Sequence, residues 1–440
     1  MTRFLSIIFA VIILSILIII HEFGHFILAK KNGIFVKEFS VGFGPRIISK
    51  VARSGTRFSW KAIPFGGSCI MLGSFEDEDD GTDDEKSYDK KSVWARMSVT
   101  LAGPFFNFLL AFVLAVIYIA AAGYDPATVT YVDEDSAAYE AGLREGDVIT
   151  KYAGKKINFG REIYVEDYIK PVEEYTDGIE IEYLRDGEKT STVLYPKETK
   201  GYMLGIGYTT ADESGAEITS VSESSGAEKG GIKVGDIIIA VNGVQVQSGD
   251  DLKNYFKDHE MTDEAVEITY TRRGGEFNTT IYPTVMSTYS TGFSYNLANV
   301  KTNALGTLKY SFAEMKYEIV TVFKSIRLLL SDRGSLDMLS GPVGIVEIVS
   351  DTYTSASSYG ILSVIMSLMS ITTMLSVNLG VLNLLPIPAL DGGKFVLLII
   401  EAIVRKPVPK KAEGIMTAIG AALLLVLACV VLVNDVIKIL

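Results

Sequence analysis

The sequence predicts a polytopic α-helical membrane protein with about four transmembrane helices, two inserted β-rich domains and a β-hairpin near the membrane. The chain of 440 residues is 48% hydrophobic and also 21% charged, so apolar and charged residues must occupy separate blocks. Four apolar blocks are long, and a repeated motif lies in the polar region between the second and the third. The net charge of −12 argues against nucleic acid as a partner.

Each long apolar segment approaches or exceeds the ~20 residues that a helix needs to cross a bilayer. The segments cover about residues 4–29, 99–122, 361–385 and 415–433. The first could instead be a cleaved signal peptide, but it lacks a small-x-small cleavage site before a polar stretch, and three further segments follow it. We therefore expect four spans in contact with the lipid bilayer.

The charges that flank the spans predict their orientation. Lysine and arginine are concentrated between spans 1 and 2 and again between spans 3 and 4, and such loops face the cytoplasm. The region between spans 2 and 3 and both termini are then extracytoplasmic. The acidic run 76–85 does not change this, because acidic residues count for little in the rule. We expect a solvated loop there, since its spacing does not match a calcium-binding loop.

Two short stretches after the first span are typical of strands. Residues 58–63 alternate apolar and polar side chains, and residues 68–72 form a second strand-like stretch. Pro64, Gly66 and Gly67 lie between them and favour a turn. We expect a β-hairpin close to the membrane, with an irregular surface loop as the alternative.

An internal repeat lies between the second and third spans. Residues 141–149 match residues 230–238, and Gly142 and Gly231 are 89 residues apart. An apolar stretch and a serine-containing turn precede each copy. A unit of that length is a small domain rather than a solenoid repeat.

The pattern of the repeat resembles the PDZ domain, and we place a first PDZ domain at 123–203 and a second at 204–290. The resemblance implies a groove in which the C-terminus of a peptide is added to the edge of a sheet. The alternative is a pair of small β domains without a peptide ligand.

The rest of the chain divides around these two domains. An N-terminal membrane region, 1–122, holds spans 1 and 2 and the hairpin loop, and a C-terminal membrane region, 361–440, holds spans 3 and 4. We expect residues 291–360 to form an amphipathic helix and a linker. Apolar residues recur at spacings of three and four from 305 to 330, which is typical of a helix lying on the membrane or on the repeat domains. The turn-rich stretch 340–345 is the expected linker.

The candidate catalytic residues begin with the pentad His21-Glu22-x-x-His25 in the apolar run of span 1. Polar groups inside a span are costly and usually functional. His21 and His25 project from the same helix face and suit two nitrogen ligands of one zinc ion. Glu22 lies about 100° round the helix and could act as a general base towards a water at such an ion. A chance occurrence of the pentad is the alternative.

A zinc site of this kind needs a third protein ligand and an open position. The remaining histidine, His259, lies in the region expected outside, so the ligand should be a carboxylate near another span. Asp391 is the best candidate, because it follows span 3 in a segment whose prolines and glycines interrupt the helix. Asp391 could instead cap the next apolar helix. Asn107 in span 2 could support the site or simply bond a neighbouring helix.

These features together resemble the bacterial site-2 proteases of the regulator-of-sigma-E type, which are intramembrane zinc metalloproteases. The resemblance covers nearly the whole chain. Besides the pentad and the PDZ pair, it rests on Gly42-Phe43-Gly44-Pro45, Gly66-Gly67, Gly103-Pro104 with Asn107-Phe108, Ser340-Gly341-Pro342, and Asn383-x-x-Pro386-x-Pro388-x-Leu390-Asp391-Gly392-Gly393.

The resemblance implies a role for each candidate residue. The implied zinc ligands are His21, His25 and Asp391, and the implied catalytic base is Glu22. The residues implied to shape the substrate path are Asn383, Pro386, Pro388, Gly66 and Gly67, the last two in a hairpin that pairs with an unwound substrate. Ser68 and Ile70 replace the aromatic residue and the lysine that are usual in the family, which bears on substrate preference.

We therefore expect a zinc-dependent intramembrane endopeptidase of the cell membrane, with its active site towards the cytoplasmic side, that cleaves single-pass membrane proteins. In the family the usual substrates are trimmed anti-sigma factors and leftover signal peptides, and the PDZ pair selects among them. A catalytically silent membrane scaffold acting through its PDZ domains is the alternative. A transporter is disfavoured, because the spans show no inverted repeat.

Overall fold

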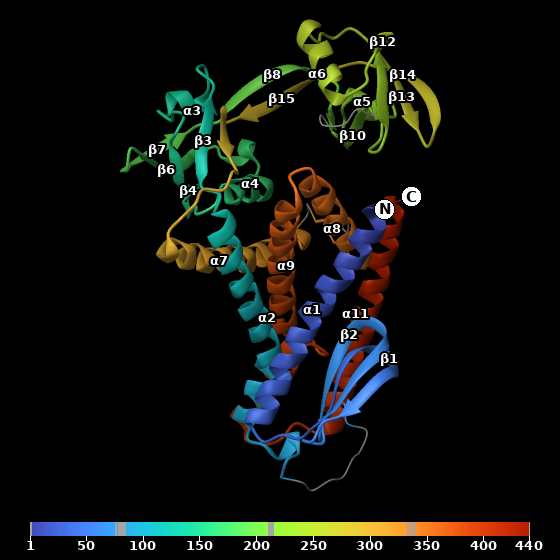
Figure 1. The fold of residues 1–440 in the computed structure, drawn as a ribbon. Helices are drawn as coiled ribbons and strands as arrows, with labels where there is room; N and C mark the ends of the chain where they lie inside the picture. Colours follow the sequence, from blue (N-terminus) through green and yellow to red (C-terminus); the bar gives the residue numbers. More distant parts are fainter. Residues whose placement is uncertain are drawn as a thin grey trace. The chain divides into compact units, whose positions relative to one another are not determined.

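The computed structural model describes residues 2–74, 77, 85–209, 215–331, 334–335 and 339–439 (Figure 1). The chain divides into two compact units. The first comprises residues 1–126, 158–165 and 297–440, and the second comprises residues 127–157 and 166–296. The acidic run 76–85 falls almost entirely outside the described residues.

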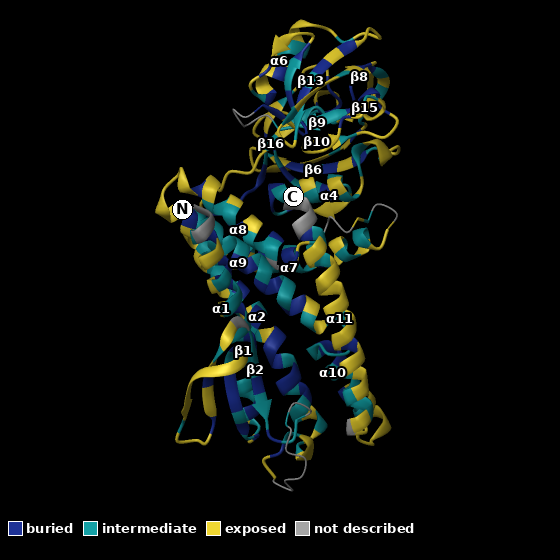
Figure 2. Ribbon diagram, turned by 90° about the vertical axis from the view of Figure 1, so that its right-hand side faces the viewer, coloured by how far each residue is buried: buried dark blue, intermediate teal, exposed yellow. Residues whose placement is uncertain are grey.

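Among the described residues, four helices of the first unit are long and apolar enough to cross a membrane. They are α1 (Thr2–Lys31), α2 (Val93–Ala122), α9 (Ile361–Leu384) and α11 (Lys410–Ile439). These helices confirm the four apolar segments. Helix α2 begins before the predicted residue 99 because Ser92 caps it, its hydroxyl accepting a hydrogen bond from the Ala95 N–H. Helix α11 is exposed along most of its length, as a lipid-facing helix should be (Figure 2).

Three further helices accompany the spans in the described part of the first unit: α7 (Ala304–Leu329), α8 (Pro342–Ser357) and α10 (Asp391–Val404). The linker predicted at 340–345 is wrong, because this stretch begins α8. Proline suits the first helical position, where its missing N–H has no partner. The Asp435 carboxylate of α11 accepts hydrogen bonds from the N–H groups of Gly341 and Gly344 at 3.0 and 2.9 Å. A tertiary contact thus caps the start of α8, which the local sequence did not predict.

A sheet follows α1 and consists of β1 (Val36–Val51) and β2 (Arg57–Met71). Residues 67–71 pair with the first part of β1, and residues 57–61 pair with both parts of it. The expected hairpin is therefore wrong in its pairing, because both predicted strands pair with β1 instead of with each other. Gly42 and Gly66 have φ of +85° and +100°, so each strand bends where only glycine is unstrained.

The spans pack through two clusters of buried apolar side chains. One apolar cluster joins Ala10, Ile13 and Leu17 of α1 to Val349 of α8. Another joins α2, α7 and α9 through Ala111, Val322, Val377 and Val381. These clusters place α1, α2 and α9 side by side, so that the ends of α1 and α9 belong to one packed body.

Helix α7 confirms the helix predicted at 305–330, but it buries a polar face. Glu314 and Glu318 are buried, whereas Phe312 and Phe323 are exposed. Arg161 forms an ion pair with Glu314. The exposed aromatic side chains are those expected to meet lipid, and the charged side fastens α7 to residues 158–165 of the same unit.

The second unit contains two sheets of similar construction. The first has the strand order β16-β3-β4-β6-β7, with β5 on β4, and the second has the order β14-β13-β11-β10-β9, with β12 on β11. The strands of the first sheet are β3 (Ala127–Val132), β4 (Val148–Tyr152), β5 (Lys155–Lys156), β6 (Ile179–Arg185), β7 (Glu188–Leu194) and β16 (Phe293–Asn296). The strands of the second are β9 (Ile206–Tyr208), β10 (Ala216–Val221), β11 (Ile237–Val241), β12 (Val244–Gln245), β13 (Val266–Arg272) and β14 (Gly275–Ile281).

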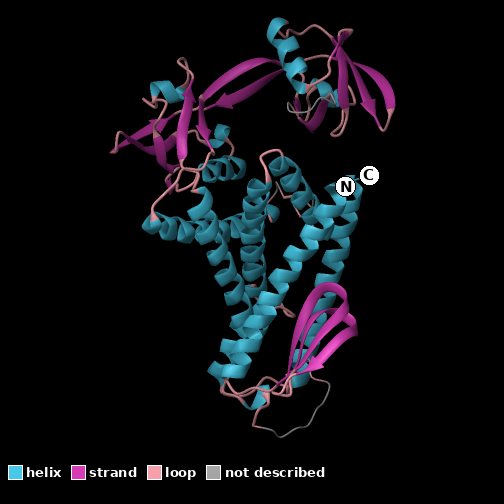
Figure 3. Cartoon of the chain, viewed as in Figure 1, coloured by secondary structure: helices cyan, strands magenta, loops and turns pink. Residues whose placement is uncertain are grey.

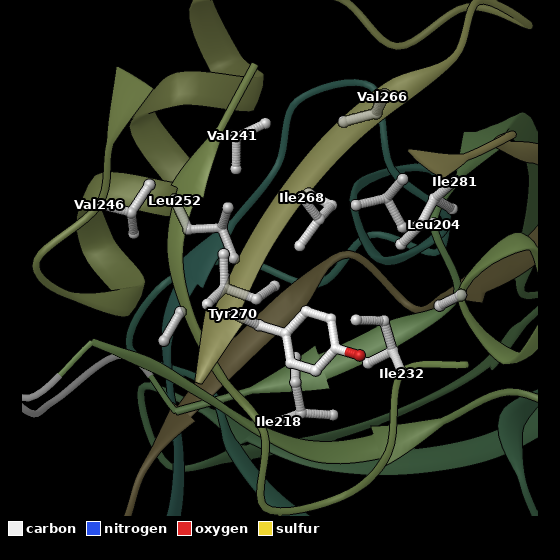
Figure 4. Packing of buried hydrophobic residues seen from close by; sticks show 13 residues of the cluster. Leu204, Ile218, Ile232, Val241, Val246, Leu252, Val266, Ile268, Tyr270 and Ile281 are labelled. Atoms are coloured by element: carbon white, nitrogen blue, oxygen red, sulfur yellow. The ribbon is translucent and has the colours of Figure 1, made fainter. Parts of the chain in front are cut away.

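Each sheet carries one short and one longer helix. They are α3 (Ala137–Glu140) and α4 (Gly160–Ile169) with the first sheet, and α5 (Gly226–Lys229) and α6 (Gly249–Asp258) with the second. The core of the second sheet is formed by side chains such as Ile218 and Ile268, with Leu252 of α6 (Figure 4). Helix α6 thus covers an apolar face of the second sheet.

The repeated motif has the same structural task in both copies. The Asp147 carboxylate accepts a hydrogen bond from the Arg144 N–H at 2.8 Å and pairs with Arg185. Asp236 repeats this with the Lys233 N–H at 2.7 Å and with Arg272. The buried aspartate therefore closes a turn and ties it to a strand, which explains why aspartate recurs at this position of the motif.

One strand crosses the boundary that the sequence predicts. β16 lies in the range 291–360, where only a helix and a linker were expected, and it pairs with β3 of the first sheet. Strand β8 (Lys197–Met203), from the end of the predicted first domain, pairs with β15 (Thr284–Ser290), from the end of the predicted second, as a separate sheet (Figure 3). The first domain is therefore completed by a segment that follows the second.

Candidate metal centre and active site

Helix α1 presents His21 and His25 on one face, one turn apart. Each histidine is only 8% exposed. Close approach of α2 makes this burial possible, because a Cβ at Gly24 would lie 2.3 Å from the Ala102 carbonyl oxygen. Glycine at position 24 therefore lets the two helices meet beside the histidines.

Asp391 is the first residue of α10, and a short non-helical segment separates it from the end of α9. The two glycines after it allow tight packing, since a Cβ at Gly392 would lie 2.3 Å from the Leu384 carbonyl oxygen. Asp391 does not occupy the capping position, which is that of Leu390. Its carboxylate lies among the histidines instead, so the capping alternative loses its support.

The three side chains converge on one point. The Asp391 Oδ2 atom lies 3.1 Å from His21 Nε2 and 3.3 Å from His25 Nε2, and the two Nε2 atoms are 3.3 Å apart. Ligand bonds of 2.0 to 2.1 Å around a tetrahedral zinc ion place the ligand atoms about 3.3 Å from one another. Asp391 Oδ2 is buried and accepts no hydrogen bond from the described residues. The cluster therefore fits a zinc ion, and its donor atoms are of the kind that zinc binds.

The outer nitrogen of each histidine contacts α2. His25 Nδ1 lies 2.8 Å from the Val99 carbonyl oxygen, and His21 Nδ1 lies 3.1 Å from the Asn107 side-chain amide. A Cβ at Gly103 would lie 2.4 Å from His25 Nε2 and 2.7 Å from His21 Nε2. Helix α2 thus supports the rings on their far side and leaves space at the converging atoms.

A cavity of about 510 Å³ opens beside the three side chains. Glu22 lines it together with the histidines and Asp391. The cavity is also lined by Phe43, Gly67, Ser68, Cys69, Ile70, Met71, Ser74, Tyr88, Val99, Thr100, Asn383, Ala389, Leu390, Lys394 and Glu413. Residues 67–71 are a stretch of β2, so the inner edge of the sheet forms one wall.

The residues expected along the substrate path divide into two groups. Asn383 and Gly67 line the cavity, whereas Gly66, Pro386 and Pro388 are not among its lining residues. A Cβ at Gly66 would clash with the Phe43 ring. Pro388 supports the loop from behind, where Gly420 of α11 packs on its carbonyl group.

Sequence reasoning missed several contributors to the site. The Val99 carbonyl oxygen belongs to the backbone, so no residue type could reveal it. Gly103 stands in a quoted motif, but only the three-dimensional structure shows that its missing side chain leaves room at the Nε2 atoms. Cys69 is buried and lines the cavity. His259, which was set aside as a ligand, is exposed and stacks on Tyr255.

The comparisons with known proteins agree with a metal-dependent peptidase centre held by membrane helices. The model of peptidase family M50 matches residues 9–427, and the chain belongs to this family. It is 30% identical to the regulator of sigma E protease of Haemophilus influenzae over 444 residues, with 97% of each chain covered. It is 28% identical to the zinc metalloprotease RasP of Geobacillus kaustophilus over 454 residues, with 98% of each covered.

A solved structure also aligns with part of the chain. The HtrA3 PDZ domain bound to a phage-derived ligand matches 21% of this chain and 92% of its own, at 23% identity and a TM-score of 0.18. With family and relatives in agreement, the protein is a zinc metalloprotease of the site-2 type and a multi-pass membrane protein. This confirms the enzyme class and the zinc cofactor expected from the sequence.

Proposed function

We propose that this chain is a zinc-dependent intramembrane endopeptidase that cleaves single-pass membrane proteins within the bilayer. The observation that carries the proposal is the convergence of three ligand atoms within 4.8 Å, with a glutamate in the same cavity. Two of these atoms come from α1, a helix of membrane length, and the third comes from the first residue of α10. His21, His25 and Asp391 hold the zinc ion, and the cavity supplies the open position that a catalytic site needs.

The bound zinc ion supplies Lewis acidity, which polarises a peptide carbonyl and makes water a nucleophile at neutral pH. Glu22 accepts the proton from the attacking water and returns it to the leaving amine. Its place one residue after His21 keeps its carboxylate beside the ligands without making it one of them. The buried histidines exclude bulk water from the reacting groups.

Residues 67–71 take the substrate as an added strand. This stretch pairs with β1 on one side and lines the cavity on the other. A substrate helix that unwinds in an apolar environment leaves its backbone N–H and C=O groups without partners, and a strand edge provides them. Asn383 contacts the substrate from the end of α9, while Gly66, Pro386 and Pro388 set the shape of the path.

The substrates belong to two chemical classes. Anti-sigma-factor-like proteins fit because the Haemophilus influenzae relative is named a regulator of sigma E protease. Signal-peptide remnants fit because each contains a single apolar segment. Ser68 and Ile70 line the cavity and distinguish the preferred side chains of the substrate.

The two β-rich domains act as PDZ domains. They bind or exclude a substrate according to the part of that substrate that lies outside the membrane. The repeat and the matching strand orders of the two sheets support this assignment. The domains lie outside the cytoplasm, with the active site towards the cytoplasmic end of α1, because lysines follow the pentad at Lys30 and Lys31.

Substitution of Glu22 by glutamine tests the proposal. Purified Glu22→Gln protein should hold about one zinc ion per chain, as the wild type does, while cleavage of a model transmembrane substrate falls by roughly 10²- to 10⁴-fold. Glu145→Gln changes an exposed glutamate and should leave cleavage unchanged. Undiminished cleavage by zinc-loaded Glu22→Gln protein would refute the assignment of the base.

The alternative is a silent scaffold that acts through its β-rich domains. It requires that purified wild-type protein neither holds zinc nor cleaves any membrane substrate. Zinc measured by mass spectrometry in the wild type and in an Asp391→Ala variant separates the two, since the protease proposal expects about one ion per chain and a large loss on substitution.

A further inference from the structure

Asn107 of α2 contacts both α1 and α9 in the first unit. It is fully buried in α2, and its side-chain amide lies 3.1 Å from His21 Nδ1. Its backbone carbonyl accepts a hydrogen bond from the Ser376 hydroxyl of α9 at 2.8 Å. Asn107 therefore links the helix of the histidines to the helix that leads to Asp391.

The chemistry of zinc binding dictates which way the Asn107 amide must face. His21 directs Nε2 towards Asp391 and His25, so this nitrogen needs a free lone pair and the proton must sit on Nδ1. An Nδ1–H group requires an acceptor. The Asn107 Oδ1 atom is buried and has no hydrogen-bond partner among the described residues. A half turn of the amide brings Oδ1 onto the His21 Nδ1–H.

His25 has the equivalent arrangement already in place. Its Nδ1 lies 2.8 Å from the Val99 carbonyl oxygen, which is an acceptor only. Val99, Gly103 and Asn107 are spaced by four and lie on one face of α2. This face supplies an acceptor for each ring, with Gly103 leaving the space between them.

We infer that Asn107 is a positioning residue for the metal site: its Oδ1 accepts the His21 Nδ1 proton and so holds the ring in the tautomer and orientation that bind zinc. Groups that accept a hydrogen bond from a zinc-bound histidine typically contribute 10- to 100-fold to metal affinity. The competing role is a polar contact between helices with no bearing on the metal.

Metal affinity distinguishes the two roles. Zinc affinity is measured by chelator competition on the full-length protein in detergent for the wild type, Asn107→Asp and Asn107→Leu. Aspartate keeps an acceptor, so the wild-type affinity should be held or exceeded, whereas leucine should weaken binding by roughly 10- to 100-fold. Thr372→Val is the matched control, because it removes a buried hydroxyl of α9 whose hydrogen bond, among the described residues, goes to the Leu368 carbonyl of the same helix.

A second measurement is independent of affinity and of cleavage. The chain has only three histidines, so labelling with ¹⁵N-histidine resolves their ring nitrogens. Zinc-loaded wild-type and Asn107→Asp protein should show His21 protonated at Nδ1 with slow proton exchange, and Asn107→Leu should show faster exchange at that proton. If the leucine variant does not fold, Asn107→Ala is measured in the same two ways.

The inference rests on the proposed zinc site, and the outcomes separate the two. Wild-type protein without zinc would refute the site itself. Wild-type protein with zinc, together with an unchanged affinity in Asn107→Leu, would refute only the role of Asn107. Equal losses in Asn107→Asp and Asn107→Leu would overturn it as well, because an acceptor would then not suffice.

Discussion

The histidines of the pentad have room for a metal ion because glycine stands at position 103. A Cβ there would lie 2.4 and 2.7 Å from the two Nε2 atoms, well inside contact distance. Gly24 serves the same close approach from the other helix, with the Ala102 carbonyl oxygen 2.3 Å from a hypothetical Cβ. At the scale of single residues, the missing side chains of α1 and α2 thus matter alongside the ligands themselves.

Gly103→Ala should weaken zinc binding by at least roughly tenfold, in the range seen when the support of a metal ligand is lost. The added methyl group competes for the space at the Nε2 atoms, so metal affinity should fall more than thermal stability. Chelator competition and thermal unfolding of the same samples check this. Gly201→Ala is the control, because a Cβ there meets nothing within 4 Å. Equal zinc affinity in the two variants would contradict the prediction.

At the scale of elements, buried charged side chains attach α7 to the rest of the first unit. Glu318 is buried beside Glu314, and Arg161 pairs with Glu314 and lies 3.5 Å from Asp125. Burial and, to a smaller extent, the nearby Glu314 raise the pKa of Glu318 to about 7, against the opposing effect of Arg161. Protonated Glu318 therefore stabilises the attachment of α7, fully below pH 4.5 and progressively less as the pH rises through 7.

Amide exchange in α7 should consequently accelerate as the pH rises from 5.5 to 8.5, by roughly tenfold or more after correction for the intrinsic rate. Glu318→Gln cannot ionise and should reduce this pH dependence strongly, while Glu314, whose pKa burial also raises, accounts for the remainder. Hydrogen-exchange mass spectrometry of both proteins is the measurement. If amide exchange in α7 depends on pH equally in the wild type and in Glu318→Gln, Glu318 does not control the attachment of α7.

At the scale of the whole molecule, the charges around the spans predict which parts face the cytoplasm. Arg53 lies in the turn between β1 and β2, and Glu188 begins β7 in the first β-rich domain. Both are exposed. The positive-inside rule places these two residues on opposite sides of the membrane.

Cysteine labelling tests this sidedness. In a background with Cys69 and Cys429 replaced by serine, Glu188→Cys should react with an impermeant maleimide in intact cells, and Arg53→Cys should react only after lysis. Retained cleavage of a membrane substrate by each variant serves as the control for folding. Labelling of both positions in intact cells would contradict the proposed topology. Labelling of Arg53→Cys alone would indicate the opposite orientation.

Local pattern sufficed for much of the architecture. The four spans follow from length and hydropathy, the repeat follows from glycine and aspartate at a fixed offset, and the pentad follows from two histidines one helical turn apart. Asp391 could be chosen as their partner because a carboxylate beside prolines and glycines after a span has few other uses. Each of these inferences depends on residues close together in the sequence or on one strong compositional signal.

The tertiary structure decided what depends on distant partners. The predicted strand at 58–63 pairs with β1, the supposed linker at 340–345 becomes α8 under the Asp435 carboxylate, and β16 joins a sheet that begins more than 150 residues earlier. The acceptors of the histidine protons are likewise a backbone oxygen and an amide on α2. Sequence by itself determined the spans and the repeat and predicted the metal ligands. Only packing of the chain determined their partners, because strand pairing and helix capping depend on groups brought together by the fold.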